Sequence, residues 1–188
     1  MSDLTYDGVL ELFVQSDKRF EQKMDRITSD FNKLNKELSR KISDLGDTLG
    51  RFAEEQVRAD LINKFDNWGI PVHAITNHYV QKDLQNEFIY EVDILIYNSQ
   101  FAIAIEVKNT LRAEHIDEHL KRIEKIQKHP MVGLEGKTLL GGVAGMIVGE
   151  GVDKYAEKNG LFVLKPSGDT VKIINDKKTF KPKKWRVG

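Results

Sequence analysis

The residue types that could do chemistry gather in one stretch of the chain, residues 90–108, which reads YEVDILIYNSQFAIAIEVK. Asp93 and Glu106 supply two carboxylates, and Lys108 supplies an ammonium group two residues after Glu106. In proteins Mg²⁺ is bound through one or two carboxylates, with water and phosphate oxygens as further ligands. A lysine beside such an ion can orient or activate the attacking water and offset charge on a phosphate. These residue types therefore predict a cation site suited to phosphate chemistry.

The strands that carry these side chains decide whether they meet. Apolar residues alternate on both sides of a short polar segment, which predicts two β-strands joined by a tight turn. With a two-residue loop at residues 99–100, antiparallel partners have numbers that sum to 199. Asp93 then faces Glu106, Glu91 lies opposite Lys108, and all four side chains project from one face. Facing carboxylates repel each other, and a divalent cation would relieve that cost.

The same residues also have a purely structural interpretation. Glu91 and Lys108 can form a cross-strand ion pair, while Asp93 and Glu106 lie at a solvated edge of the sheet. Both alternatives require the same hairpin, so the register is the expectation on which the site depends.

Composition limits the classes of protein that the chain can belong to. Its 188 residues suffice for one ordinary domain with an appendage, and 29 Lys and Arg balance 29 Asp and Glu, so any surface for nucleic acid must be local. The absence of cysteine excludes disulfides and thiolate chemistry and suits a reducing compartment. No apolar run is long enough to span a membrane, and the first residues lack a basic signal-peptide region. A soluble cytoplasmic protein without membrane contact is expected.

The first 49 residues are expected to form a coiled-coil stalk. Apolar residues recur in alternating steps of three and four, with Asp17 in one position of the seam and a stutter after Leu38. A helix with so narrow an apolar stripe needs a partner, so we expect a homodimer or higher homo-oligomer through residues 9–52, in which Asp17 helps to fix the register. The alternative is a helix folded back onto its own domain. The seam consists of Leu10, Phe13, Phe20, Met24, Ile27, Phe31, Leu34, Leu38, Ile42, Leu45, Leu49 and Phe52.

Glu54 is a further candidate for the site. The helical pattern continues to Gly69, with a break expected near Gly46 or Gly50, and Glu54 falls on its inward apolar stripe. A carboxylate on such a stripe is unusual, although a surface pair with Arg51 or Arg58 would also explain it.

The next elements are a strand from Ile70 to Gln81 and, after the hairpin, a helix capped by Asn109 or Thr110 that runs to about Lys128. Four histidines on these elements are not expected to bind metal, because they lack the HExxH frame and the helical pair lies among acidic residues. The basic side chains of the helix can meet phosphates or pair with its own glutamates. The histidines are His73, His78, His115 and His119, and the basic residues are Arg112, Lys121, Arg122, Lys125 and Lys128.

The last part of the chain contains a buried strand at residues 138–148, a short helix at 152–159 and a further strand, which together predict a parallel crossover. The glycines of the buried strand lack a phosphate-loop frame, so close packing of a helix is the better explanation. A basic tail follows at residues 176–188. Its Phe180 and Trp185 are expected either to stack on nucleic-acid bases or to pack back on the domain.

The order of these elements, αβββαβαβ, resembles the PD-(D/E)xK or restriction-endonuclease-like nuclease superfamily over residues 50–175. Asp93 matches the family's Asp, Glu106 and Lys108 its ExK, and Glu54 the acidic residue on its first core helix, whereas Val92 stands in place of the family's Pro. The chain also resembles prokaryotic members that place a coiled coil before such a domain. This resemblance implies an α/β fold with a mixed sheet.

For activity, the resemblance implies a nuclease that uses Mg²⁺ or Mn²⁺ to hydrolyse phosphodiester bonds in DNA. Asp93 and Glu106 would be metal ligands, Lys108 would position the water, and Glu54 would be an outer ligand. The alternatives are a non-catalytic nucleic-acid-binding module and a coiled-coil assembly scaffold that retain the fold.

Overall fold

The computed structural model describes residues 6–58, 60–168 and 170–188, which divide into two compact units, one ending at Asp47 and the other spanning Thr48–Gly188. Helix α1, Tyr6–Arg58, runs through the expected break points at Gly46 and Gly50 without interruption. The break falls further along, where Asp60 has a left-handed backbone (φ 65°) and starts the short helix α2, Leu61–Asp66. No helix in the described ranges has the length and apolar character needed to cross a membrane.

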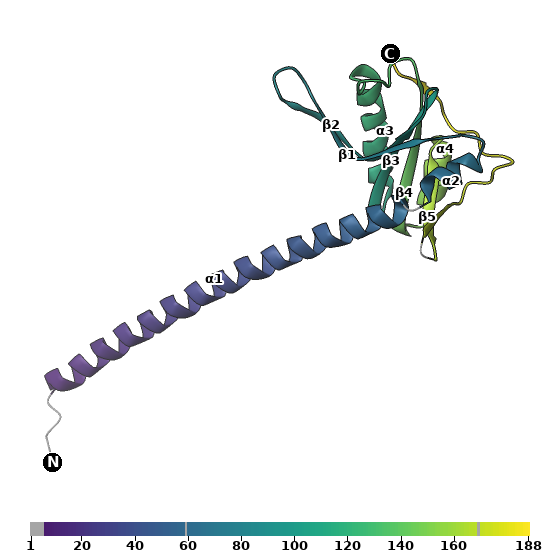
Figure 1. The fold of residues 1–188 in the computed structure, drawn as a ribbon. Coiled ribbons are helices and arrows are strands. Elements are labelled where there is room, and N and C mark those ends of the chain that lie inside the picture. Colours follow the sequence, from purple (N-terminus) through teal and green to yellow (C-terminus); the bar gives the residue numbers. More distant parts are fainter. Residues whose placement is uncertain (1–5, 59, 169) are drawn as a thin grey trace. The chain divides into compact units, whose positions relative to one another are not determined.

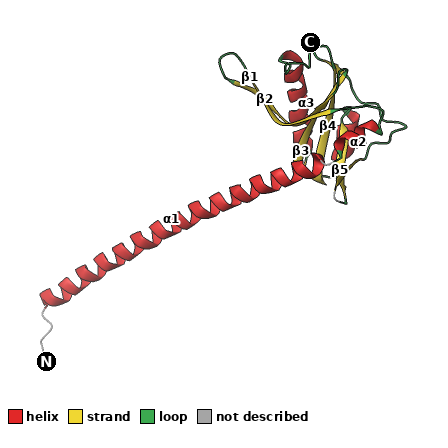
Figure 2. Cartoon of the chain, viewed as in Figure 1, coloured by secondary structure: helices red, strands yellow, loops and turns green. Residues whose placement is uncertain are grey.

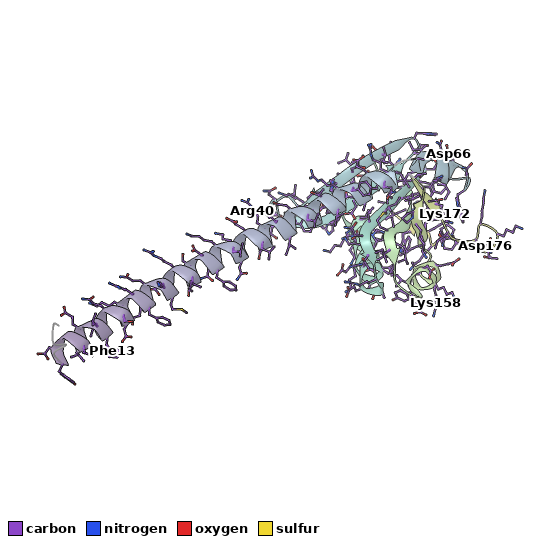
Figure 3. All side chains as sticks on the ribbon, turned by 90° about the horizontal axis from the view of Figure 1, so that it is seen from below. Phe13, Arg40, Asp66, Lys158, Lys172 and Asp176 are labelled. Carbon is purple, nitrogen blue, oxygen red and sulfur yellow. The ribbon has the colours of Figure 1, made fainter. Side chains whose placement is uncertain are left out.

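The predicted stalk is helical over its whole described length, and its apolar seam is exposed. Phe13, Phe31 and Leu38 have exposed fractions of 66%, 61% and 54%. Figure 3 shows side chains projecting from α1 along its length, with Phe13 labelled. An exposed stripe of this kind has no covering element within its own unit, so its pairing with another chain stays a prediction.

The second unit is built around a mixed sheet, in which seven strands are described (Figures 1 and 2). The spatial order is β1-β2-β3-β4-β5-β6, with β3, β4 and β5 parallel, the other neighbours antiparallel, and β7 paired with β4. The predicted hairpin and the parallel crossover are therefore confirmed. The strands are β1 Ala74–Lys82, β2 Phe88–Tyr97, β3 Phe101–Leu111, β4 Thr138–Val148, β5 Phe162–Ser167, β6 Thr170–Ile173 and β7 Trp185–Arg186.

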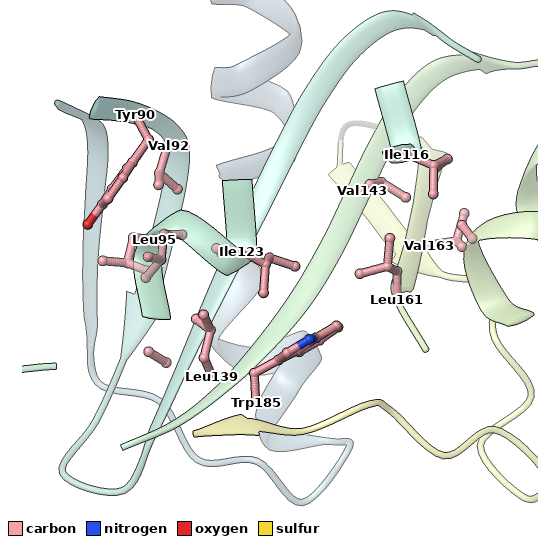
Figure 4. Packing of buried hydrophobic residues seen from close by; sticks show 14 of the residues in the cluster. Tyr90, Val92, Leu95, Ile116, Ile123, Leu139, Val143, Leu161, Val163 and Trp185 are labelled. Atoms are coloured by element: carbon pink, nitrogen blue, oxygen red, sulfur yellow. The ribbon is translucent and has the colours of Figure 1, made fainter. Parts of the chain in front are cut away.

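Helices cover both faces of this sheet. Helices α3, Ala113–Lys128, and α4, Val152–Lys158, pack on one face, where Ile123 and Val143 are buried (Figure 4). The last turns of α1 and helix α2 pack on the other face, against Ile105. Successive strand residues alternate between the two cores, as the period of a strand requires. This three-layer arrangement of helix, sheet and helix fixes which strand side chains meet which helix.

Two sequence predictions for the middle of the chain concern the residue that caps α3 and the packing at the glycines of β4. Asn109 and Thr110 do not cap α3, because β3 continues to Leu111 and Arg112 is the capping residue. The close packing expected at the glycines of β4 is confirmed, since a Cβ on Gly141 would lie 2.6 Å from Cδ1 of Ile123 on α3.

The C-terminal residues rejoin the domain, so they are not an extended tail. Trp185 lies in β7, pairs with Leu139 of β4 and is 9% exposed, and Phe180 is 8% exposed. The ring of Phe180 makes edge-to-face contacts with Phe162 and Trp68. Of the two alternatives, packing back on the domain is confirmed, and stacking on nucleic-acid bases is not, because the hydrophobic core already buries both side chains.

Candidate active site

The register of the central hairpin places the candidate site. The N–H of Asn98 donates to the carbonyl oxygen of Phe101 at 2.9 Å, which closes a two-residue loop as predicted. Pairs from Tyr97 with Ala102 to Ile94 with Ile105 keep the predicted sum of 199. Regular pairing of β2 with β3 ends at that point, while β2 continues along β1 into the projecting hairpin of Figure 1.

Asp93 lies one residue beyond the last regular pair. Its Oδ2 accepts a hydrogen bond of 2.8 Å from the backbone N–H of Val107, the residue between Glu106 and Lys108. The side chain thus takes the place of a backbone acceptor and holds a carboxylate beside the ExK segment. The predicted neighbourhood of Asp93, Glu106 and Lys108 is confirmed in this form.

Glu106 is the most buried charged residue of the site, with 1% of its surface exposed. Lys108 lies on the same face of β3, and its Nζ is 2.6 Å from Oε1 of Glu106. Arg122 of α3 donates from Nη1 to the other oxygen, Oε2. Both oxygens of Glu106 therefore have cationic partners, which compensate for the loss of water around a buried carboxylate.

The pKa values of the three groups follow from this arrangement. Burial and the nearby charge of Glu106 raise the pKa of Asp93 to about 6. Burial alone would raise the pKa of Glu106, but the charge of Arg122, together with the hydrogen bond and charge of Lys108, outweighs it and lowers that pKa. Burial would lower the pKa of Lys108, and its hydrogen bond and attraction to Glu106 raise it instead. At neutral pH the site consists of two carboxylates and two cations.

Glu91 is not opposite Lys108, and that prediction is wrong. Val92 packs in the core beneath α3, whereas Ile94, two residues later, packs in the opposite core, so the alternation of β2 changes around Asp93. Glu91 consequently turns to the other face, where its Oε1 is 3.5 Å from Nδ1 of His78.

His78 links Glu91 to Glu54. Its Nε2 lies 2.7 Å from Oε2 of Glu54, in the last turns of α1. Burial raises the pKa of Glu54, and the neighbouring His78 partly offsets this. His78 has a left-handed backbone (φ 49°), which is unusual for a residue with a side chain, and its register position is opposite Asp93. His78, to which the sequence patterns assigned no role, therefore has two carboxylate partners.

His119 and Arg122 are residues of the site whose contacts the sequence patterns did not predict, since Arg122 pairs with Glu106 of β3 and not with a glutamate of its own helix. His119 was expected on a solvated face, but it is fully buried, and its Nε2 lies 3.1 Å from the carbonyl oxygen of Ala104. Burial lowers the pKa of His119 to about 4, so the ring is neutral at neutral pH. The available signal was spacing, because His119 lies three residues after Ile116 and four before Ile123 on the buried stripe of α3.

The carboxylate oxygens of Asp93 and Glu106 are the type of ligand that a hard divalent cation takes, although these two residues do not surround an ion. In the described ranges, no three His, Asp or Glu side chains are close enough to hold a metal ion together. Asp93 and Glu106 remain as a repelling pair of oxygen donors, and one or two protein carboxylates are what Mg²⁺ commonly takes. Glu54 lies close enough for the charge of Lys108 to affect its pKa, but its carboxylate is engaged by His78.

A groove of about 300 Å³ adjoins Arg122 between the start of β2 and α3. Three basic residues line it, and Lys125 donates from Nζ to the carbonyl oxygen of Ile89 at 2.9 Å. The lining residues are Phe88, Ile89, Tyr90, Glu91, Glu118, Lys121, Arg122 and Lys125.

No protein-family model matches the chain, and no curated protein matches it. The chain is similar to the crystal structure of a repair endonuclease from Pyrococcus abyssi, with 17% identity and a TM-score of 0.36. The alignment covers 60% of this chain and 46% of that one, so the chain spans less than half the length of that endonuclease. What the site can do is therefore derived from its own side chains.

Proposed function

We propose that this protein is a metal-dependent nuclease that hydrolyses phosphodiester bonds in DNA, built on a restriction-endonuclease-like core. The observation that carries the proposal is the hydrogen bond from the N–H of Val107 to Asp93. Through that bond, one carboxylate is held beside the segment that carries Glu106 and Lys108. Two carboxylates and an ammonium group at one point of a sheet are the minimum set for this chemistry.

The residues would divide the work as follows. Asp93 and Glu106 would hold Mg²⁺ or Mn²⁺, with Glu54 as an outer ligand. The bound ion would supply a water of lowered pKa and a counter-charge for the phosphate. Lys108 stays an ammonium at neutral pH, because its pKa is raised, so it would orient the water and attract the phosphate without acting as a base.

A cleavage assay tests this proposal. The full chain is incubated with single-stranded, duplex and branched DNA in Mg²⁺ or Mn²⁺, beside Lys108→Ala, Asp93→Asn and the control Lys172→Ala, which removes an exposed lysine on β6. Loss of one essential group should lower the rate by roughly a hundredfold or more, while the control keeps the wild-type rate. Equal trace activity in all four proteins would mean contamination and would refute the proposal.

A specific observation favours a second candidate function, a non-catalytic DNA-binding module that keeps the fold. Both oxygens of Glu106 are already neutralised by Lys108 and Arg122, so the site is electrostatically satisfied without a metal. This candidate predicts DNA binding that is steeply salt-sensitive, unaffected by EDTA and never followed by cleavage.

The assembly proposed with this function is a homodimer or higher oligomer, formed through the seam of residues 9–52. The stalk would bring two or more domains to one nucleic acid and raise their effective concentration. The lack of cysteine agrees with a cytoplasmic location.

A further inference from the structure

Arg122 forms an ion pair with Glu106, although it lies outside the ExK segment and has no part in the proposed chemistry. Arg122 reaches from α3 to Oε2 of Glu106, the oxygen that Lys108 leaves free. The side chain of Arg122 is 22% exposed, whereas that of Glu106 is 2% exposed, so the guanidinium joins the buried carboxylate to the surface. The guanidinium is therefore the partner that a cation would have to displace from that oxygen.

The helix that carries Arg122 is anchored to the sheet by the residue one turn earlier. His119 is fully buried, and its Nε2 meets the carbonyl oxygen of Ala104 on β3 at 3.1 Å. Residues three apart on a helix share a face, so this contact orients Arg122 over Glu106. The helix backbone at Arg122 is therefore anchored against β3, and the guanidinium itself is paired with Glu106.

Arg122 also lines the adjoining groove, which offers its side chain a second partner. Lys121, Lys125 and Glu118 also line this groove, while the carboxylate of Glu91 lies beside His78, so the groove carries an excess of positive charge. One phosphate suits this balance, and a guanidinium binds phosphate through two parallel N–H donors.

We propose that Arg122 is a substrate-operated gate, an inference that rests on the proposed function. In the resting chain its guanidinium occupies Oε2 of Glu106, and it must leave before that oxygen can bind a cation. A phosphate of the DNA backbone in the groove draws the guanidinium away and opens Glu106. Cation and DNA then bind cooperatively, and each tightens the other by the same factor. Arg122 is in this sense a positioning residue.

The test measures binding and not activity. The dissociation constant for Mn²⁺ is obtained by calorimetry on the full-length wild type, Arg122→Gln, Arg122→Lys and the matched control Lys121→Gln, with Asp93→Asn to show that the ion binds at this site. The affinity for Ca²⁺, used to prevent cleavage, is then measured with and without a saturating short DNA oligonucleotide. Circular dichroism checks the fold of each variant, and Arg122→Lys, which keeps a charge beside Glu106, replaces Arg122→Gln if the latter does not fold.

Removal of the gate should tighten Mn²⁺ binding by about tenfold in Arg122→Gln, with a smaller gain in Arg122→Lys and less than twofold in Lys121→Gln. DNA should tighten Ca²⁺ binding to the wild type by about fivefold and leave Arg122→Gln unchanged. Binding of Mn²⁺ to Arg122→Gln alone would also support the gate.

Three outcomes would overturn the inference. An unchanged affinity in Arg122→Gln, with wild-type binding that Asp93→Asn abolishes, refutes the gate and leaves the nuclease proposal standing. An equal gain in Mn²⁺ affinity for Lys121→Gln means that the overall positive charge of α3, and not the position of Arg122, weakens Mn²⁺ binding. Absence of Mn²⁺ binding in every chain refutes the gate and the metal-dependent function together.

Discussion

Asp93 and Val107 are joined by a hydrogen bond of 2.8 Å in which a side-chain oxygen replaces a backbone acceptor at the point where β2 and β3 cease to pair. The bond lowers the pKa of Asp93, while burial and the charge of Glu106 raise it, and the net result is about 6. The carboxylate is held in a place where its charge is costly. A carboxylate whose pKa is raised by an unfavourable environment is typical of sites that bind a cation or a substrate.

Asp93→Asn should stabilise the metal-free protein above pH 6. The folded pKa lies above that of the unfolded chain, so between about pH 4 and pH 6 the folded state binds the extra proton and stability falls as the pH rises. Asparagine removes this cost and can still accept the bond from Val107, which predicts a gain on the order of 2 kcal/mol at pH 7.5. Urea unfolding at pH 7.5 and pH 4 measures it, and a gain of equal size at both values would contradict this origin.

His119→Gln should have the opposite pH dependence. The folded pKa of about 4 lies below the ordinary value of 6.5, so the unfolded chain takes up a proton first as the pH falls, and stability is lost between about pH 6.5 and pH 4. This group accounts for about 3 kcal/mol of acid sensitivity, which glutamine, able to donate to Ala104, should remove. In unfolding curves, Asp93→Asn should therefore lose more stability than the wild type on acidification to pH 4, and His119→Gln should lose less. Parallel curves for the two variants would show that neither assignment holds.

The same substitution should have opposite effects at two glycines. A Cβ on Gly145 of β4 would lie 2.7 Å from the Cβ of Leu111 and 2.9 Å from the carbonyl oxygen of Ile147, so Gly145→Ala should destabilise the domain by about 1–3 kcal/mol. Gly46 lies in helix α1 with nothing within 4 Å, so Gly46→Ala should stabilise the helix by about 1 kcal/mol. Thermal unfolding followed by circular dichroism measures both changes. Tolerance of alanine at Gly145 would mean that β4 and β3 can move apart there.

Phe31→Glu should dissociate the proposed oligomer. The side chain lies in the exposed seam of α1, where a charge would be buried if two stalks paired. Light scattering should give a multiple of 21.6 kDa for the wild type and for Asn32→Glu, which adds a charge one residue along on the outer side, and 21.6 kDa for Phe31→Glu. A wild type that is already monomeric would remove the assembly from the proposal, with no effect on the site of the second unit.

Local patterns sufficed for much of the candidate site. The alternation of residues 92–107 and the polar turn gave the register, which agrees with the structure from Ile94–Ile105 to Tyr97–Ala102. The same counting failed for Glu91, because β2 changes its alternation around Asp93, and no periodic pattern contains such an irregularity. The partners of Glu106 and Glu54 were missed because they come from α3 and β1, at sequence separations where spacing carries no information.

The chain alone was enough to establish the hairpin, the long apolar seam and the set of carboxylates and lysine, because these depend on the periods of strands and helices and on the identity of neighbouring residues. Packing settled the rest. Whether a carboxylate at Asp93 or Glu106 keeps its charge depends on how much water the helices exclude and on which cation they bring within reach, as Arg122 shows. These quantities arise from contacts between segments far apart in the chain, and they exist only once the sheet and its two helical layers have assembled.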